Sequence, residues 1–175
     1  MRYILSLVAL TLLASCASLS EDECRLGDWR SIGFEDGSKG LQPDFVANHR
    51  EACAEFGVSP DLNAYLAGRE LGLREYCVPI RAYRLGREGR PISNVCPATI
   101  EPVLRDANAH GREYFRLSGE IRALEREIAE LRSSAVAPDA PNAGTINGSL
   151  NSSILSAQSR INILRARRLI YASWP

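Results

Sequence analysis

Residues 65–77 read Tyr65-Leu66-Ala67-Gly68-Arg69-Glu70-Leu71-Gly72-Leu73-Arg74-Glu75-Tyr76-Cys77. The composition predicts a helix, yet two glycines interrupt it, and each costs a helix about 1 kcal/mol relative to alanine. Spacings of three and four residues place both tyrosines and both glycines along one helix face. We interpret this face as a core contact at which a neighbouring backbone or aromatic ring approaches closely.

Looser copies of the aromatic-x-x-Gly pattern occur on both sides, at Phe34–Gly37 and at Tyr83–Gly86. Apolar and aromatic stripes at helical spacing usually pack in a core. The alternative is a groove that binds a small ligand or a cell-wall fragment. The residues of this possible groove are Tyr65, Gly68, Gly72, Tyr76 and Tyr83.

The chain has 175 residues, enough for one domain or for a domain with an extension. Its 21 basic residues balance its 21 acidic residues. A nucleic-acid-binding surface normally requires a basic excess, so we expect no nucleic-acid partner.

The N-terminus predicts the cellular compartment. A positively charged start precedes the apolar run Ile4–Leu12, which is too short to span a bilayer and fits a secretory signal over residues 1–15. The following Leu13-Ala14-Ser15-Cys16 resembles the lipobox of bacterial lipoproteins, in which the new N-terminal cysteine is acylated. Ala17, where an aspartate would retain the protein in the inner membrane, predicts sorting to the outer membrane, facing the periplasm. The alternative is an ordinary signal peptide with an incidental Cys16.

Four further cysteines remain, and an even number in an oxidising compartment predicts disulfides. Residues 16–27 would form a tether and residues 28–100 a small helical domain with helices near 29–39, 44–56, 60–77 and 79–89. At 1.5 Å per residue, Cys53 and Cys77 would lie about 25 Å apart in a helical hairpin, too far for a bond. We therefore favour Cys24–Cys53 and Cys77–Cys96. A zinc site that uses these cysteines with His49 is the competing interpretation.

Residues 101–175 predict an antiparallel helical hairpin of coiled-coil character. A heptad-spaced apolar seam begins at Leu117. A Pro/Gly-rich flexible linker covers about 133–149, and a second amphipathic face begins at Leu150. This seam could instead meet another chain. The seam residues are Leu117, Ile121, Leu124, Ile128 and Leu131, and the second face carries Leu150, Ile154, Ile161 and Leu164.

These features together resemble the bacterial lipoprotein family known as domain of unknown function 2799. The resemblance covers most of residues 23–96, a helical C-terminus is also typical of the family, and no activity or ligand is implied. Its motifs are Glu23-Cys24, Asp28-Trp29, Gly33 to Gly37, His49 to Cys53, Tyr65 to Cys77, Tyr83-x-x-Gly86-x-x-Gly89 and Val95-Cys96.

No catalytic motif, phosphate loop or metal-ligand spacing is present, so we expect no cofactor or metal and a non-enzymatic role. His49 and His110 are expected as satisfied core or boundary side chains, and Glu35 and Asp36 as solvated helix charges rather than a cation site. The leading hypothesis is a structural or adaptor lipoprotein. It would contact the bilayer through the Cys16 acyl chains, and an envelope protein or a second copy through its C-terminal helices. A periplasmic binding module and an enzyme with an unrecognised site are the alternatives.

Overall fold

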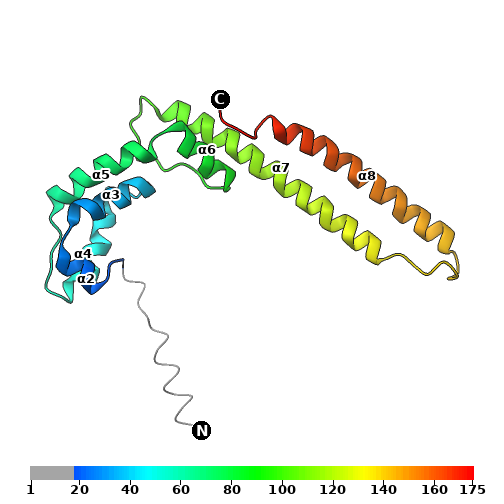
Figure 1. Cartoon of the computed structure of the whole chain (residues 1–175), viewed down its shortest axis with the longest axis horizontal. Helices are drawn as coiled ribbons and strands as arrows, with labels where there is room; N and C mark the ends of the chain where they lie inside the picture. Colours follow the sequence, from blue (N-terminus) through cyan, green and yellow to red (C-terminus); the bar gives the residue numbers. More distant parts are fainter. Residues whose placement is uncertain (1–17) are drawn as a thin grey trace, which may run out of the picture. The chain divides into compact units, whose positions relative to one another are not determined.

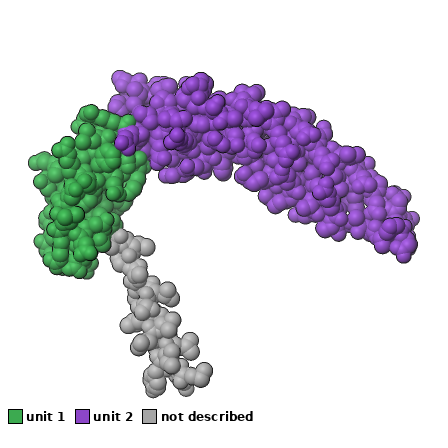
Figure 2. All heavy atoms as spheres, in the orientation of Figure 1, with its two compact units in different colours: residues 1–74 green, residues 75–175 purple. Residues whose placement is uncertain are grey.

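The computed structural model describes residues 18–175, and helices are the only regular structure in that range (Figure 1). The mainly α fold predicted from the sequence is confirmed. The chain divides into two compact units, Met1–Arg74 and Glu75–Pro175 (Figure 2). Cys16 and the predicted signal sequence lie outside the described residues.

The division between the units differs from the predicted domain boundary near residue 100. It falls in the last turn of helix α5 (Leu62–Tyr76), between Arg74 and Glu75. Helix α6 (Pro79–Arg87), expected in the cysteine domain, packs instead on helix α7 (Glu101–Ser133). This contact joins α6 to the C-terminal half, because glycines on both helices let their backbones meet.

Unit 1 contains the helices α2, α3 and α4, a short 3-10 turn η1, and most of α5. Helices α3 and α4 end in Lys39 and Ala54, close to the predicted ends. The core around the first disulfide gathers side chains from every α-helix of the unit: Cys24, Trp29, Val46, Cys53 and Tyr65, joined by Leu19. The bounds are α2 Glu21–Leu26, α3 Trp29–Lys39, η1 Pro43–Phe45 and α4 Val46–Ala54.

Helix α2 corrects the prediction that residues 16–27 form a tether. Ser20 accepts a hydrogen bond from the Glu23 backbone N–H, and the Glu23 carboxylate accepts one from the Ser20 backbone N–H, which completes a capping box. The helix ends at Gly27, whose φ of 65° is left-handed. With Cys24 fully buried, this segment belongs to the core of unit 1.

Four glycines form the contact between α3 and α5. A Cβ added at Gly33 would lie 2.0 Å from the Tyr65 carbonyl oxygen, and one at Gly68 would lie 1.9 Å from the Arg30 carbonyl oxygen. Gly37 and Gly72 repeat these two contacts one turn further along, against Arg69 and Phe34. The helices therefore touch backbone to backbone, and no larger residue fits at any of the four positions.

Unit 2 uses the same device once more. A Cβ at Gly86 of α6 would lie 2.2 Å from the Asn108 carbonyl oxygen, and one at Gly111 of α7 would lie 2.2 Å from the Tyr83 carbonyl oxygen. The buried Asn108 amide nitrogen donates to the carbonyls of Ala82 at 3.0 Å and Arg90 at 2.9 Å. These bonds lock α6 and the loop after it onto α7.

Helix α7 then runs alongside α8 (Ala143–Leu169) as an antiparallel hairpin (Figure 1). Its core consists of Ile121, Leu124, Ile128, Ala157 and Ile161, with Ile154 and Leu164 at the margin. On the surface of the hairpin, Glu125 of α7 and Arg165 of α8 form an ion pair at 2.8 Å.

The linker is shorter than predicted, because α8 begins at Ala143 and includes Gly144 and Gly148. Asn147 explains the early start. Its side-chain amide accepts from the Val136 N–H at 3.1 Å and donates to the Val136 carbonyl at 2.9 Å, so it ties the linker to the first turns of α8. Across residues 18–175, no helix has the length and apolar character needed to cross a membrane.

Candidate functional site

A buried polar network joins three helices of unit 1. Asp36 on α3 accepts, at its Oδ2 atom, a hydrogen bond of 2.8 Å from the Tyr65 hydroxyl on α5. The same oxygen lies 2.8 Å from Nε2 of His49 on α4. Burial, followed by the hydrogen bond to Asp36, raises the pKa of Tyr65 above its ordinary value, so the phenol remains a donor.

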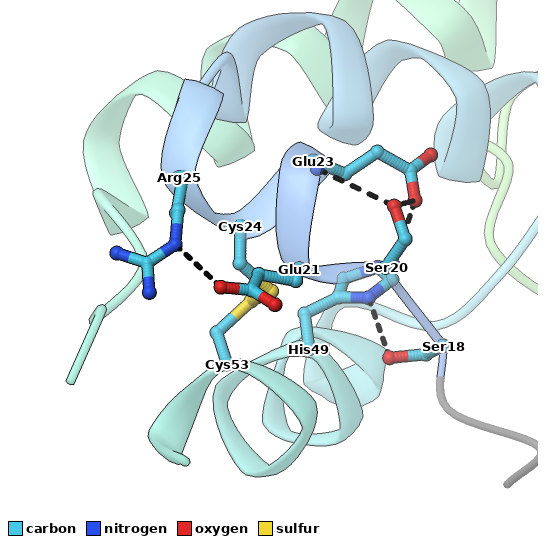
Figure 3. Close-up of a disulfide and its surroundings, with 8 residues drawn as sticks. All are labelled: Ser18, Ser20, Glu21, Glu23, Cys24, Arg25, His49 and Cys53. Atoms are coloured by element: carbon cyan, nitrogen blue, oxygen red, sulfur yellow. Dashed lines mark hydrogen bonds and ion pairs between the residues drawn. A yellow bond between two sulfur atoms is a disulfide. The ribbon is translucent and has the colours of Figure 1, made fainter. Parts of the chain in front are cut away.

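The network reaches the first described residue of the chain. Nδ1 of His49 lies 2.9 Å from the Ser18 hydroxyl (Figure 3). Directly beside it, the Cys24–Cys53 disulfide holds α2 on α4, with a Cα–Cα distance of 5.4 Å. Leu19, between Ser18 and the capping box, is buried in the same core. The site is therefore a clamp on residues 18–24, and we call it the N-terminal clamp.

Serine, histidine and aspartate are also the three residue types of a hydrolytic triad. In this arrangement the imidazole is 2% exposed, and both of its nitrogens are occupied. The arrangement is suited to holding Ser18 in place.

The prediction of solvated charges at Glu35 and Asp36 is right for Glu35, which pairs with Lys39 on the surface, and wrong for Asp36. Asp36 shares a buried face with Trp29 and Gly33, at spacings of seven and three residues. That spacing is the sequence signal that could have revealed it. Nothing in the sequence pointed to Ser18.

The glycine-tyrosine face proposed as a groove is occupied by the protein itself. Gly68 and Gly72 are covered by the backbone of α3. Tyr65 belongs to unit 1 and the clamp, whereas Tyr76 and Tyr83 are buried in unit 2. Core packing, the preferred interpretation of this pattern, accounts for all five residues.

The tyrosines of unit 2 have partners of their own. The Tyr76 hydroxyl accepts from the Ser93 N–H at 2.9 Å, and the Tyr83 hydroxyl donates to the Tyr171 carbonyl at 2.8 Å. His110 of α7 contributes to the same contact, with Nε2 at 3.0 Å from the Ser173 carbonyl and its ring against Trp174. Residues 171–174 are thus held on α6 and α7 by hydrogen bonds and ring contacts.

The cysteines pair as Cys24–Cys53 and Cys77–Cys96, the two pairs that the helix lengths favoured. Four cysteines in disulfides leave no thiolate for the competing zinc site. Within residues 18–175, no group of three or more side chains that could hold a metal ion is found. Beside Cys96, the loop after α6 and the start of α7 enclose an open hollow of about 320 Å³, with Arg105 and Arg112 at its wall.

The far side of α8 carries a second feature, an exposed apolar stripe. We define the outer stripe of α8 as the four most exposed large apolar residues from Leu155, near the middle of the helix, to Ile170, directly after its end. They are Leu155 at 66%, Ile163 at 65%, Leu169 at 73% and Ile170 at 69% exposure. Exposed apolar residues gathered on one face of a helix can mark an interaction surface.

The family comparison covers the clamp helices and both glycine contacts. A model of the family described as protein of unknown function (DUF2799) matches residues 28–113, from the cap of α3 to the first third of α7. Neither a curated protein nor a solved structure matched the chain. Residues 18–24 of the clamp and the outer stripe of α8 lie outside the matched range. Residues 28–113, just under half of the chain, are thus similar to the DUF2799 family, whose function is unknown.

Proposed function

We propose that the protein is a lipid-anchored structural or adaptor protein of the bacterial cell envelope. It would be acylated at Cys16, face the periplasm from the outer membrane, and catalyse no reaction. Its helical hairpin would be the surface that contacts other envelope components.

The observation that carries the proposal is the position of the N-terminal clamp relative to Cys16. Ser18 is bonded to buried His49, and Leu19 is part of the core. Only Ala17 stands between Ser18 and Cys16, and two consecutive residue steps span at most about 7 Å. If Cys16 carries acyl chains, unit 1 is held against the bilayer without a flexible tether.

A rigid attachment suits a protein that positions other components better than one that searches for a soluble ligand. The hairpin supplies the reach, since the 33 residues of α7 extend about 50 Å at 1.5 Å per residue. Disulfides in both units and backbone-to-backbone helix contacts keep each unit rigid. Rigid anchoring and a long arm are the properties of a spacer or scaffold.

The test combines anchoring with geometry. Intact-mass analysis of the membrane fraction should find a chain that begins at an acylated Cys16, and Cys16→Ala should release the protein into the periplasm. An insertion of twelve Gly/Ser residues between Ala17 and Ser18 should leave acylation intact. It should lower the yield of crosslinks between the hairpin and its neighbours in intact cells.

Two controls make the insertion informative. The same insertion in the linker after Ser134 leaves the anchor geometry unchanged and shows the effect of lengthening the hairpin alone. A freely soluble, unmodified periplasmic protein would contradict the anchor. Unchanged crosslinks after the insertion at Ser18 would contradict the importance of the short attachment.

A further inference from the structure

We propose that the C-terminal part of α8, over residues 155–170, binds an anionic lipid surface. The inference rests on the proposed function, because it names the envelope component that this face of the hairpin contacts. It needs no acyl chain, and it can therefore be tested apart from the anchor.

The residues of the outer stripe lie on the face of α8 opposite its contact with α7. At 100° per residue, Ile163 and Ile170 lie on nearly the same line along α8, and Leu155 and Leu169 both lie to one side of it, about 80° and 120° from Ile163. The opposite face of the helix carries Ala157 and Ile161, which are buried against α7. The stripe therefore points away from the hairpin core, and no described part of the chain covers it.

The segment that carries the outer stripe is basic. From Ala143 to the C-terminus the chain has no acidic residue, and its four arginines all lie in the part that carries the stripe. Arg160 and Arg167 project on one border of the stripe and Arg165 on the other. The basic residues are Arg160, Arg165, Arg167 and Arg168.

Carboxylates of α7 neutralise only part of this charge. Arg165 pairs with Glu125 at 2.8 Å and Arg167 with Glu113 at 3.6 Å. Arg168 lies over the Tyr114 ring, 5.3 Å from its centroid. Arg160 has no ionic partner among the described residues. An apolar stripe with arginines on both borders is the pattern of a helix that lies in the interface of an anionic membrane.

The same charges argue against a second copy of the chain on this face. An antiparallel pair that set Leu155 against Ile170 of the other copy would bring Arg160 close to its Arg167. A parallel pair would also set arginines against arginines, and no acidic residue of α8 could relieve either arrangement. The arginines beside the stripe would repel a second copy of the chain, whereas they would attract an anionic surface.

The proposed anchor, and not the aromatic end of the chain, favours a bilayer over an acidic protein helix. Tyr171 and Trp174 follow the stripe, but both are half-buried with their rings against His110, so the contact would be made by the stripe and its arginines. A bilayer is the one anionic surface that the proposed anchor already keeps nearby.

The experiment uses the chain from residue 16 with Cys16→Ser, so that no acyl chain contributes. Cosedimentation with vesicles of phosphatidylglycerol and phosphatidylethanolamine is compared with vesicles of phosphatidylcholine alone. We expect binding to the anionic vesicles at least about tenfold tighter, and weaker binding at high salt. Ile163→Ser with Ile170→Ser, or Arg160→Glu with Arg167→Glu, should abolish that difference.

Matched controls keep the result specific. Leu26→Ser changes an equally exposed leucine of unit 1, and Arg126→Glu reverses an exposed arginine of α7; both should bind as the parent does. All variants change exposed residues, and helical melting curves check that they fold. Equal binding to both vesicle types, or no binding, would overturn the proposal.

Other occupants would give different results. A dimer in sedimentation analysis that Ile163→Ser dissociates, without vesicle binding, would assign the stripe to a second copy. Crosslinks to one acidic envelope protein, again without vesicle binding, would assign it to a protein partner. Either result would overturn the lipid proposal and leave the acylation of Cys16 untouched.

Discussion

The α3–α5 contact of unit 1 and the α7–α8 hairpin of unit 2 hold their helices together in opposite ways. In the first, glycines bring two backbones into direct contact, and an added Cβ at Gly72 would lie 2.0 Å from the Phe34 carbonyl oxygen. In the second, branched side chains such as Ile121, Leu124 and Ile161 fill the space between the helices. The first contact admits one geometry, whereas the second can relax around a change.

Helix α7 shows both modes along its own length. Gly111 touches the backbone of α6, and ten residues later Ile121 begins the side-chain core with α8. The family match ends at residue 113, just after the last glycine contact. The glycine contacts thus lie inside the matched range, whereas most of the hairpin and its outer stripe lie outside it.

The largest effect is expected where a side chain is forced into the glycine contact. Gly72→Leu should destabilise unit 1 by more than about 3 kcal/mol, because the carbonyl of Phe34 is backbone and cannot move aside. Ala67→Leu, on the exposed side of the same helix, should change stability by less than about 0.5 kcal/mol. Urea unfolding followed by circular dichroism measures both.

Glycine content alone does not predict this effect, and α8 supplies the control. Nothing lies within 4 Å of a Cβ placed at Gly144, so Gly144→Ala should stabilise the protein by about 0.5–1 kcal/mol. If Gly72→Leu proved as stable as the parent protein, the close approach of α3 and α5 would be wrong.

The next effect concerns the polar bonds that cross the glycine contact. Asp36→Ala leaves Nε2 of His49 and the Tyr65 hydroxyl without a partner in the core, which should cost about 3 kcal/mol. Glu35→Ala removes only an exposed pair with Lys39 and should cost less than about 0.5 kcal/mol. Thermal unfolding measures the melting temperatures of both variants. Equal melting temperatures for Asp36→Ala and Glu35→Ala would contradict the buried hydrogen-bond network of Asp36.

The hairpin should respond more mildly and locally. Leu124→Ala should cost about 2 kcal/mol, at the lower end for a buried leucine, because a two-helix layer can close around the cavity. Hydrogen exchange should increase for α8 and the distal half of α7, with no change in α3 or α5. Faster exchange in unit 1 would show that the two packing modes are coupled.

The smallest effect is expected at the cap of α2. Ser20→Ala should cost about 1 kcal/mol at neutral pH, since it removes the hydroxyl that bonds to Glu23. That hydroxyl, followed by the Ser20 backbone N–H, lowers the pKa of Glu23 below its ordinary value of 4.5. The folded state therefore favours the carboxylate, and the contribution is complete above pH 4.5 and lost as the pH falls through the lowered pKa.

The difference in melting temperature between Ser20→Ala and the parent should accordingly shrink as the pH falls from neutral through the lowered pKa of Glu23. Ser149→Ala, at an exposed position of α8, serves as the control and should show no such trend. A difference that grows in acid would mean that Glu23 is not held as a carboxylate by the cap.

The sequence contains the signals for most of the helices and for the glycine contact. Glycine costs a helix stability, so Gly68 and Gly72 within a helical pattern required a close neighbour. The helix lengths also limited the cysteine pairing, because a disulfide cannot bridge the length of a helix. These inferences depend on local spacing alone, so the order of residues along the chain was enough to reach them.

Three features of the structure differ from the sequence predictions: helix α2, the start of α8 and the boundary between the units. Helix α2 had a readable signal, the Ser20-x-x-Glu23 capping box, inside a segment interpreted as a tether. The early start of α8 had none, since it depends on Asn147 reaching back to Val136. The unit boundary at Arg74 likewise depends on which helix α6 meets, and that choice is made by long-range packing.

By itself, the sequence determined the helical class, the close-contact glycines and the favoured cysteine pairs, because each depends on the geometry of a single helix or on its length. Only the tertiary structure decided that Asp36, His49 and Tyr65 meet in one core, that Ser18 is bonded to them, and that the outer stripe of α8 remains uncovered. Whether a helix face is buried depends on which other surface packs against it, and the sequence of one helix does not specify that surface. Asp36 and Tyr65, 29 positions apart, become hydrogen-bond partners only because α3 and α5 pack together.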